Sequence, residues 1–153
     1  MKRDSKLSNV LHILLHLAEW DDPITSDGLA DMLQTNPVVI RRLLAGLRER
    51  EYVRSEKGHG GGWTLSCQLE NVTLRDVYDA VGSPPLLAIS HRTETPDCLV
   101  EQAVKDSLDG ALQEAEATLL SRFEDISLAQ LSDDFHKRFE LHIKNTRRNH
   151  EPA

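Results

Sequence analysis

The sequence predicts a mainly α-helical fold that carries one small β-hairpin and continues into a long C-terminal helix. Apolar residues recur at three- and four-residue spacing in several segments of this 153-residue chain, which is the period of an amphipathic helix. Four glycines crowd residues 58–62 between two short strand-like segments and mark a tight turn. The apolar stripe between residues 97 and 122 is longer than a small domain can cover alone. We therefore expect a compact N-terminal part and an extended helical part.

Composition is that of one globular domain, or one domain with an appended element. Hydrophobic residues make up 39% and charged residues 28% of the chain, which are ordinary globular values. No apolar run approaches the roughly 20 residues that a membrane span needs. The first ten residues are too polar for a signal peptide. We therefore expect a cytoplasmic protein that does not contact a membrane.

The formal net charge of −7 is spread unevenly along the chain. Residues 1–63 contain nine basic and nine acidic residues, whereas the remaining ninety contain nine and sixteen. Between Asn36 and Trp63 there are six basic and three acidic residues. A small basic surface on an acidic body suits contact with nucleic acid over a limited footprint, and it argues against non-specific coating.

Two helices are expected before residue 35. The apolar stripe of the first helix, Lys6 to Glu19, consists of Leu7, Val10, Leu11, Leu14, Leu15 and Ala18. Pro23 ends this helix, because proline disfavours a helical residue before it. Ser26 is a candidate N-cap of a second, short helix that reaches Leu33. We interpret both helices as scaffold.

The segment from Thr35 to Gly62 has the most informative pattern. Asn36 is a good N-cap, and Pro37 follows at the first helical position, where its missing N–H costs nothing. The predicted apolar face is Val39, Leu43, Leu44 and Leu47, and the predicted basic face is Arg41, Arg42, Arg48 and Arg50. Strands are expected at 52–54 and 63–67. A helix that presents its first turn beside a hairpin with a basic tip has the shape that reads a DNA major groove and the adjacent minor groove.

Three stretches carry a family resemblance: Asn36 to Leu44, Leu47-Arg48, and the run G-x-G-G-G-W after Lys57. They resemble the bacterial Rrf-two family of winged helix-turn-helix transcriptional regulators, in the IscR/NsrR-like superfamily. Val72 to Tyr78 is similar to the next helix of that family, so the resemblance covers roughly the whole chain. It implies a mainly α fold with a small β-wing, divided into a winged helix-turn-helix DNA-binding domain at 1–82, a linker loop at 83–96, a dimerisation helix with a short following helix at 97–133, and a C-terminal tail at 134–153.

DNA contacts are predicted from the first turn of the 37–49 helix and from the glycine-rich hairpin. Val38 and Val39 suit thymine methyl groups, while Arg41 or Arg42 suits guanine or phosphate. Lys57 and the imidazole of His59 suit the neighbouring minor groove; the resemblance implies an Arg at the position of Lys57 in many relatives, and Arg reads that groove more strongly. The full predicted set is Ser26, Asn36, Pro37, Val38, Val39, Arg41, Arg42, Arg48, Lys57, Gly58, His59, Gly60, Gly61 and Gly62.

Thr73 is predicted to cap the next helix, with Asp76 in a capping-box position. A loop follows, and then the long helix from Asp97 to about Arg122. The predicted cover for its stripe is the same helix of a second subunit, antiparallel across a two-fold axis, and the family also dimerises through such a helix. The alternative is a helix that folds back onto its own domain. The predicted dimer interface is Val100, Val104, Leu108, Ala111, Leu112, Ala115 and Leu119. Ser127 is expected to open a short final helix.

The two cysteines, Cys67 and Cys98, do not make a disulfide framework. Several relatives hold an iron–sulfur cluster on three cysteines, which this chain cannot supply, so we expect no cofactor and no metal. An atypical site that joins Cys98 with His12 or His91 is an alternative. Cys98 lies at the first turn of the long helix, where the helix dipole favours the reactive thiolate, so it is a candidate redox-regulatory residue. The alternative is that Cys98 only packs the start of the helix.

No catalytic constellation or phosphate-binding loop is present, so we expect no enzyme activity. The sequence favours a homodimeric transcriptional repressor that binds a pseudo-palindromic operator in double-stranded DNA. The alternative is a winged-helix protein-interaction module that docks an acidic protein partner. The two differ in sequence preference, since a protein-docking wing should not discriminate among DNA duplexes.

Overall fold

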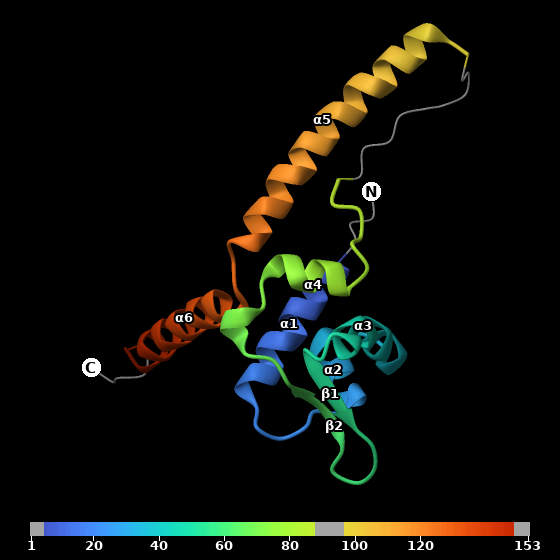
Figure 1. Cartoon of the computed structure of the whole chain (residues 1–153). Coiled ribbons are helices and arrows are strands. Elements are labelled where there is room, and N and C mark those ends of the chain that lie inside the picture. Colours follow the sequence, from blue (N-terminus) through green and yellow to red (C-terminus); the bar gives the residue numbers. More distant parts are fainter. Residues whose placement is uncertain (1–4, 88–96, 149–153) are drawn as a thin grey trace.

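The computed structural model describes residues 5–87 and 97–148, with side chains described as far as Asn145. A compact body holds the N-terminal helices and the hairpin, and one long helix projects away from it (Figure 1). The elements are α1 (Lys6–Glu19), α2 (Ser26–Leu33), α3 (Pro37–Glu49), β1 (Val53–Glu56), β2 (Gly62–Leu65), the 3-10 turn η1 (Leu69–Asn71), α4 (Leu74–Ala80), α5 (Leu99–Glu124) and α6 (Leu128–Arg148). Within the described ranges, none of the helices is both long and apolar enough to cross a membrane.

The body is built around one face of α1. The buried residues of this helix are Val10, Ile13, Leu14 and Leu17. They follow the i, i+3, i+4, i+7 pattern of a helix face that packs on a core. Leu15 and Ala18, expected in the buried stripe, are only half-buried. The buried face of α1 is therefore turned by about one residue from the predicted stripe. Neighbouring apolar residues in this helix permit either direction of burial.

The hairpin is short and its register is regular. β1 and β2 pair antiparallel, from Val53 opposite Leu65 to Glu56 opposite Gly62. The first strand begins one residue later than expected and runs to Glu56, and the second ends at Leu65 instead of Cys67. An isolated bridge joins Ile24, before α2, to Trp63 in β2. The segment between α1 and α2 therefore pairs with β2 at one residue, on the side away from β1.

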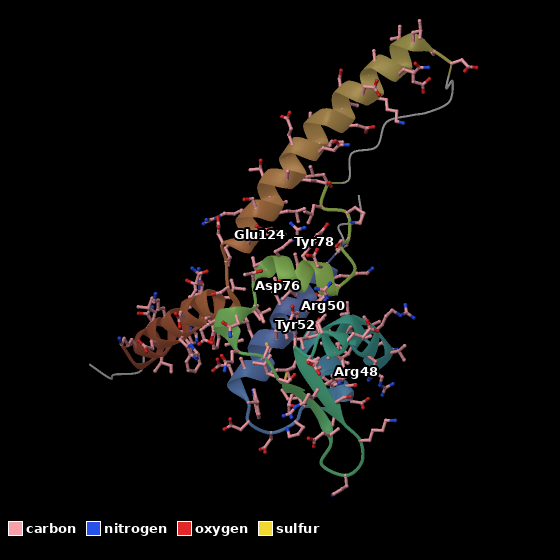
Figure 2. All side chains as sticks on the ribbon, in the orientation of Figure 1. Arg48, Arg50, Tyr52, Asp76, Tyr78 and Glu124 are labelled. Carbon is pink, nitrogen blue, oxygen red and sulfur yellow. The ribbon has the colours of Figure 1, made fainter. Side chains whose placement is uncertain are left out.

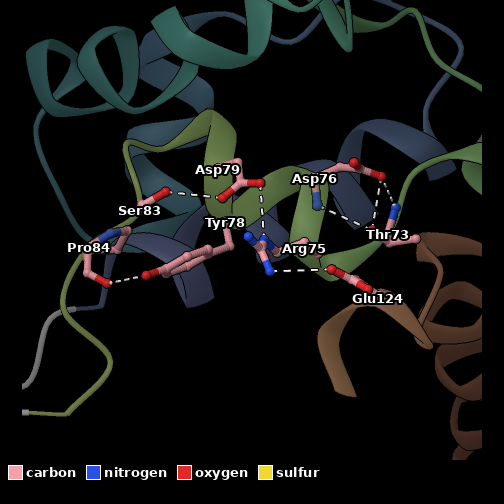
Figure 3. Close-up of polar contacts among 8 residues, drawn as sticks. All are labelled: Thr73, Arg75, Asp76, Tyr78, Asp79, Ser83, Pro84 and Glu124. Carbon is pink, nitrogen blue, oxygen red and sulfur yellow. Dashed lines mark hydrogen bonds and ion pairs between the residues drawn. The ribbon is translucent and has the colours of Figure 1, made fainter. Parts of the chain in front are cut away.

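The predicted capping box at the start of α4 is confirmed (Figure 3). The backbone N–H of Thr73 donates to the Asp76 carboxylate at 2.8 Å, and the backbone N–H of Asp76 donates to the Thr73 hydroxyl at 3.2 Å. At the other end of α4 the buried hydroxyl of Tyr78 donates to the carbonyl of Pro84 at 3.0 Å. These bonds fix α4 at the junction of the body with α5.

Within the described ranges, α5 meets the body at its C-terminal end. The ring of Phe123 packs edge-on against Tyr78, with centroids 6.2 Å apart. Arg75 forms an ion pair with Glu124 at 3.3 Å (Figure 3). The helix begins at Leu99, two residues later than expected, and ends at Glu124. Most of the expected linker, residues 88–96 with His91, lies outside the described residues.

The helix after Ser127 is longer than predicted. The sequence suggested a short helix followed by a separate tail from residue 134, whereas α6 runs without a break to Arg148. Its start is fixed by a reciprocal pair: the backbone N–H of Ser127 donates to the Gln130 amide oxygen at 2.8 Å, and the backbone N–H of Gln130 donates to the Ser127 hydroxyl at 3.2 Å. No Gly or Pro follows before residue 148 to end the helix. The final residues 149–153 lie outside the described part of the chain.

Candidate nucleic-acid interface

The first turn of α3 is set by the predicted cap. The Asn36 side chain accepts a hydrogen bond from the backbone N–H of Val38 at 2.8 Å, and Pro37 occupies the first helical position. Both features agree with the sequence prediction. Because the cap holds this turn, the residues that follow it leave the body in fixed directions.

The two faces of α3 differ sharply in burial. The buried residues are Ile40, Leu43, Leu44 and Leu47. Arg41 and Arg42 are exposed, and Arg48 and Arg50, labelled in Figure 2, are exposed at its C-terminal end. Val39, predicted to lie in the apolar stripe, is 38% exposed, and Ile40 is buried in the core in its place. Val38 and Val39 therefore lie on the outer surface beside the arginines, as a groove-reading turn requires.

The hairpin turn is shaped by glycines with positive φ. Gly58 has φ of 97° and Gly60 has φ of 77°, a region in which residues with a Cβ are strained. The backbone N–H of Gly61 donates to the Gly58 carbonyl at 3.1 Å and closes the turn. Lys57 and His59 are both exposed in this turn. The two side chains predicted to enter the minor groove are thus displayed at the tip of the wing.

The wing is tied to the body at its second strand. Trp63 is buried, and its backbone exchanges two hydrogen bonds with Ile24, at 3.0 and 2.8 Å. A Cβ on Gly62 would stand 2.7 Å from the Ile24 carbonyl, so only glycine permits this approach. The Trp63 indole N–H donates to the Ser26 hydroxyl at 2.9 Å. The wing therefore keeps a fixed relation to α2 and α3.

The prediction for Ser26 was wrong in part. Thr25, not Ser26, is the N-cap of α2, and its hydroxyl accepts from the backbone N–H of Gly28 at 3.1 Å. The hydroxyl of Ser26 is instead engaged with Trp63. Two adjacent hydroxyl residues satisfy the same capping pattern, so the sequence alone did not separate them. A DNA contact from Ser26 stays a prediction.

Lys6 and Asn9 are not among the DNA-contacting residues predicted from the sequence. They line a surface hollow of about 420 Å³ together with Val39 and Arg42 of α3. The start of α1 is more than thirty residues away in the chain, and only the packing of α1 on α3 brings it beside the exposed arginine. Gly46 permits a close approach of α4 at the same place, because a Cβ there would stand 1.9 Å from the Ala80 carbonyl. Basic character near the N-terminus was the only sequence signal for Lys6.

The predicted dimer face of α5 has no cover within the described chain. No residue of α5 is buried, and Val100, Val104 and Leu108 are 73%, 50% and 37% exposed. Ala111 and Ala115 are also exposed, while Leu112 and Leu119 are half-buried. The stripe thus exists as an exposed apolar surface on a projecting helix.

Residues 3–134 match the family model named Rrf2, which is described as an iron-dependent transcriptional regulator. The chain belongs to the Rrf2 family of transcriptional regulators. The expected resemblance is confirmed, and so is the mainly helical winged-helix fold class.

Three relatives illustrate the range of similarity to Rrf2 proteins. YwnA of Bacillus subtilis, named as an HTH-type transcriptional regulator, is 29% identical over 116 residues, covering 76% of this chain and 86% of YwnA. YffB of Lactococcus lactis, with the same kind of name, is 27% identical over 150 residues, or 92% and 93% of the two chains. A transcriptional-regulator structure from Lactobacillus plantarum has a TM-score of 0.72 and 25% identity, covering 93% of this chain and 98% of that one.

The iron in the Rrf2 description finds no fitting set of ligands among the described residues. Cys67 is half-buried against the core, and burial raises the pKa of its thiol, which opposes the thiolate that a metal needs. Cys98 is exposed at the N-cap of α5. Over residues 5–87 and 97–148, no group of three His, Cys, Asp or Glu side chains is arranged to hold a metal ion. A three-cysteine cluster would also need one more cysteine than the sequence contains.

Proposed function

We propose that this Rrf2-family protein binds double-stranded operator DNA as a homodimer through α3 and the wing, and that it acts as a repressor. The observation that carries the proposal is the division of α3 into a buried leucine-rich face and an exposed face of Val38, Val39, Arg41 and Arg42. A helix anchored on one side and capped at its first turn delivers the other side to a partner without further ordering.

The outer face of α3 matches what a major groove offers. Val38 and Val39 project from the first turn, where apolar groups can contact thymine methyls. Arg41 and Arg42 follow on the same exposed surface and are suited to guanine O6 and N7 or to a phosphate. Arg48 lies two turns further and is assigned to the phosphate backbone. Lys6, beside Arg42, is added to the predicted set of contacts.

The wing is assigned to the adjacent minor groove. Lys57 and His59 are exposed at its tip, and the glycines at 58 and 60 to 62 let the backbone approach a groove wall. The anchoring of Trp63 to Ile24 and Ser26 supports this assignment, because a wing that swings freely would lose the benefit of preorganisation. Lys57 supplies a charge but not the planar fork of an arginine, so we expect modest sequence preference there.

The homodimer is assigned to the exposed stripe of α5. Two antiparallel copies of this helix would cover Val100, Val104 and Leu108 of each subunit. A two-fold dimer presents two copies of α3, which read half-sites one helical turn apart, or a multiple of it, about 34–36 Å per turn. The operator is then pseudo-palindromic. The role as repressor rests on analogy with the family.

Cys98 is assigned as a redox-regulatory residue. Its side chain is exposed and makes no capping hydrogen bond at the start of α5, so an oxidant can reach it. Oxidation there would alter the beginning of the dimer helix and thereby the spacing of the two α3 helices.

The test is selection from a random-duplex library with the purified full chain, in reductant and again after mild peroxide. We expect an enriched inverted repeat in reductant. Its loss after peroxide in the wild type and in Cys67→Ser, but not in Cys98→Ser, would assign the response to Cys98. Enrichment that ignores peroxide would remove the redox part and leave the DNA-binding part. Absence of any enriched sequence would refute the proposal in favour of the protein-docking alternative.

A further inference from the structure

The outer side of α1 carries two histidines that converge on one point. His12 and His16 are four residues apart, one helical turn, and their Nε2 atoms are 2.9 Å apart. The ring centroids are 4.7 Å apart, so the rings approach each other at their Nε2 edges. One shared proton can occupy the space between these nitrogens, and so can a metal ion that replaces it.

The distance between the two Nε2 atoms fits a right angle at a shared metal ion better than a tetrahedral angle. Two imidazole nitrogens bound to one ion at right angles, each about 2.1 Å from it, lie roughly 3 Å apart, whereas a tetrahedral angle separates them by about 3.4 Å. The observed 2.9 Å agrees with the right angle. Right-angled ligands occur in octahedral, tetragonal and square-planar coordination, and among the divalent first-row ions that take these geometries Ni²⁺ and Cu²⁺ bind nitrogen ligands most tightly.

The surroundings of the pair also suit a bound cation. His12, His16 and Glu19 line a cavity of about 130 Å³ together with Leu15 and Phe135. That volume exceeds the roughly 15 Å³ that one water molecule needs, so an ion can keep water ligands there.

A carboxylate lies at the edge of this cavity and links α1 to α6. Glu19 accepts a hydrogen bond from His136 of α6, with the Nε2–Oε1 distance 3.0 Å. The other carboxylate oxygen of Glu19, Oε2, lies 3.1 Å from the same His136 nitrogen. The negative charge of Glu19 is therefore held at the cavity that the two histidines line, where it favours a bound cation.

We propose that His12 and His16 bind one late divalent transition-metal ion of the Ni²⁺ or Cu²⁺ type, with water at its other positions. The described residues contain no ready-made group of three ligands, so the site is a two-imidazole chelate completed by solvent. It lies on α1 and uses none of the residues assigned to DNA contact or to redox response. Its success or failure is therefore independent of the proposed function.

The experiment is a titration of the metal-free, tag-free full chain with NiCl₂, followed by calorimetry and by thermal unfolding. We expect one Ni²⁺ per chain and a melting temperature that rises with Ni²⁺ concentration, since a ligand of the folded state stabilises it by mass action. His12→Gln and His16→Gln should each weaken binding by at least about tenfold and remove most of the thermal shift.

The matched control is His142→Gln, which removes an exposed histidine of α6 that does not line the cavity. It should bind Ni²⁺ like the wild type. His12 is exposed, so His12→Gln is expected to fold, and its melting curve in EDTA verifies this. All variants retain both cysteines, so thiol binding would persist in all of them. Wild-type binding in His12→Gln and His16→Gln, or no stoichiometric binding in the wild type, would overturn the proposal.

Discussion

The helices α3 and α5 carry similar apolar stripes, but only one of them is buried. In α3, Ile40, Leu44 and Leu47 are fully inaccessible because α1, α2 and the hairpin surround them. In α5, no residue is buried, and Val100 of its stripe is 73% exposed. Burial of apolar area contributes about 25 cal/mol per Å². The body therefore gains this stabilisation within one chain, whereas the described residues leave most of the α5 stripe without it, as the proposed dimer requires.

The stability of the body and the oligomeric state of the protein should therefore depend on different helices. The body has its own core, and α5 is attached to it at one end. The attachment consists of Phe123 on Tyr78 and of the Arg75–Glu124 pair, the second of which Figure 3 shows. Substitutions in the stripe of α5 should then change the oligomeric state and leave the body folded. Substitutions in the core of α3 should unfold the body.

Val104→Lys should abolish the dimer. Two lysines would enter a two-fold interface, and an unpaired buried charge costs about 3–5 kcal/mol. We expect at least a roughly hundredfold weaker association by sedimentation velocity, since about 1.4 kcal/mol is tenfold. Gln113→Lys adds the same charge on the opposite side of α5 and should remain dimeric. Equal sedimentation of both variants would contradict the assigned interface.

Leu44→Ala should destabilise the body by about 2–5 kcal/mol, because it leaves a cavity at a fully buried position. Urea unfolding, followed by far-ultraviolet circular dichroism, measures the loss. Val39→Ala, on the exposed side of the same helix, should change the free energy of unfolding by about 0.5 kcal/mol or less. Similar losses in the two variants would mean that α3 does not have one buried face.

Arg42→Ala should weaken operator binding by about 1–3 kcal/mol if the side chain reads a base. Lys57→Ala should have a smaller effect that is similar for all sequences and reduces the salt slope by about one. Gel retardation over a salt series distinguishes the two. Lys137→Ala, which removes an exposed charge from α6, is the control. Unchanged retardation in both wing and helix variants would refute the assigned contacts.

Tyr78→Phe should cost about 1 kcal/mol through loss of the 3.0 Å bond to Pro84. The pKa of the Tyr78 hydroxyl is raised above its ordinary value of 10.0, chiefly by burial and then by the negative charges of Glu116 and Asp79. The unfolded chain therefore ionises first, so this stabilisation is complete below pH 10 and is lost as pH rises through the folded pKa.

Alkaline unfolding of Tyr78→Phe should consequently be less steep than that of the wild type. Tyr52→Phe, at a half-buried tyrosine in the same body, serves as the control. A wild-type alkaline slope in Tyr78→Phe would show that this hydroxyl does not contribute.

Local signals in the sequence were the most reliable. The bounds of α1, the Asn36 cap and the Thr73–Asp76 box were predicted as observed, because each depends on residues within one turn. The buried face of α1 and the place of Val39 were misjudged, because a run of apolar residues permits more than one direction of burial. The length of α6 was underestimated, because its second half is polar and shows little apolar periodicity. The helix continues there without a buried face.

The family, the order of the helices and the hairpin, and the polarity of the α3 faces could all be predicted from the sequence, because capping, period and turn chemistry depend on neighbouring residues. The contacts between distant segments required the folded chain: Trp63 is held by Ile24 and Ser26, Lys6 lines the same hollow as Arg42, and Glu19 meets His136. Those pairs are separated by 36 to 117 residues in the chain, so no local pattern predicts them. They exist because the core closes around α1 and brings distant side chains to one surface.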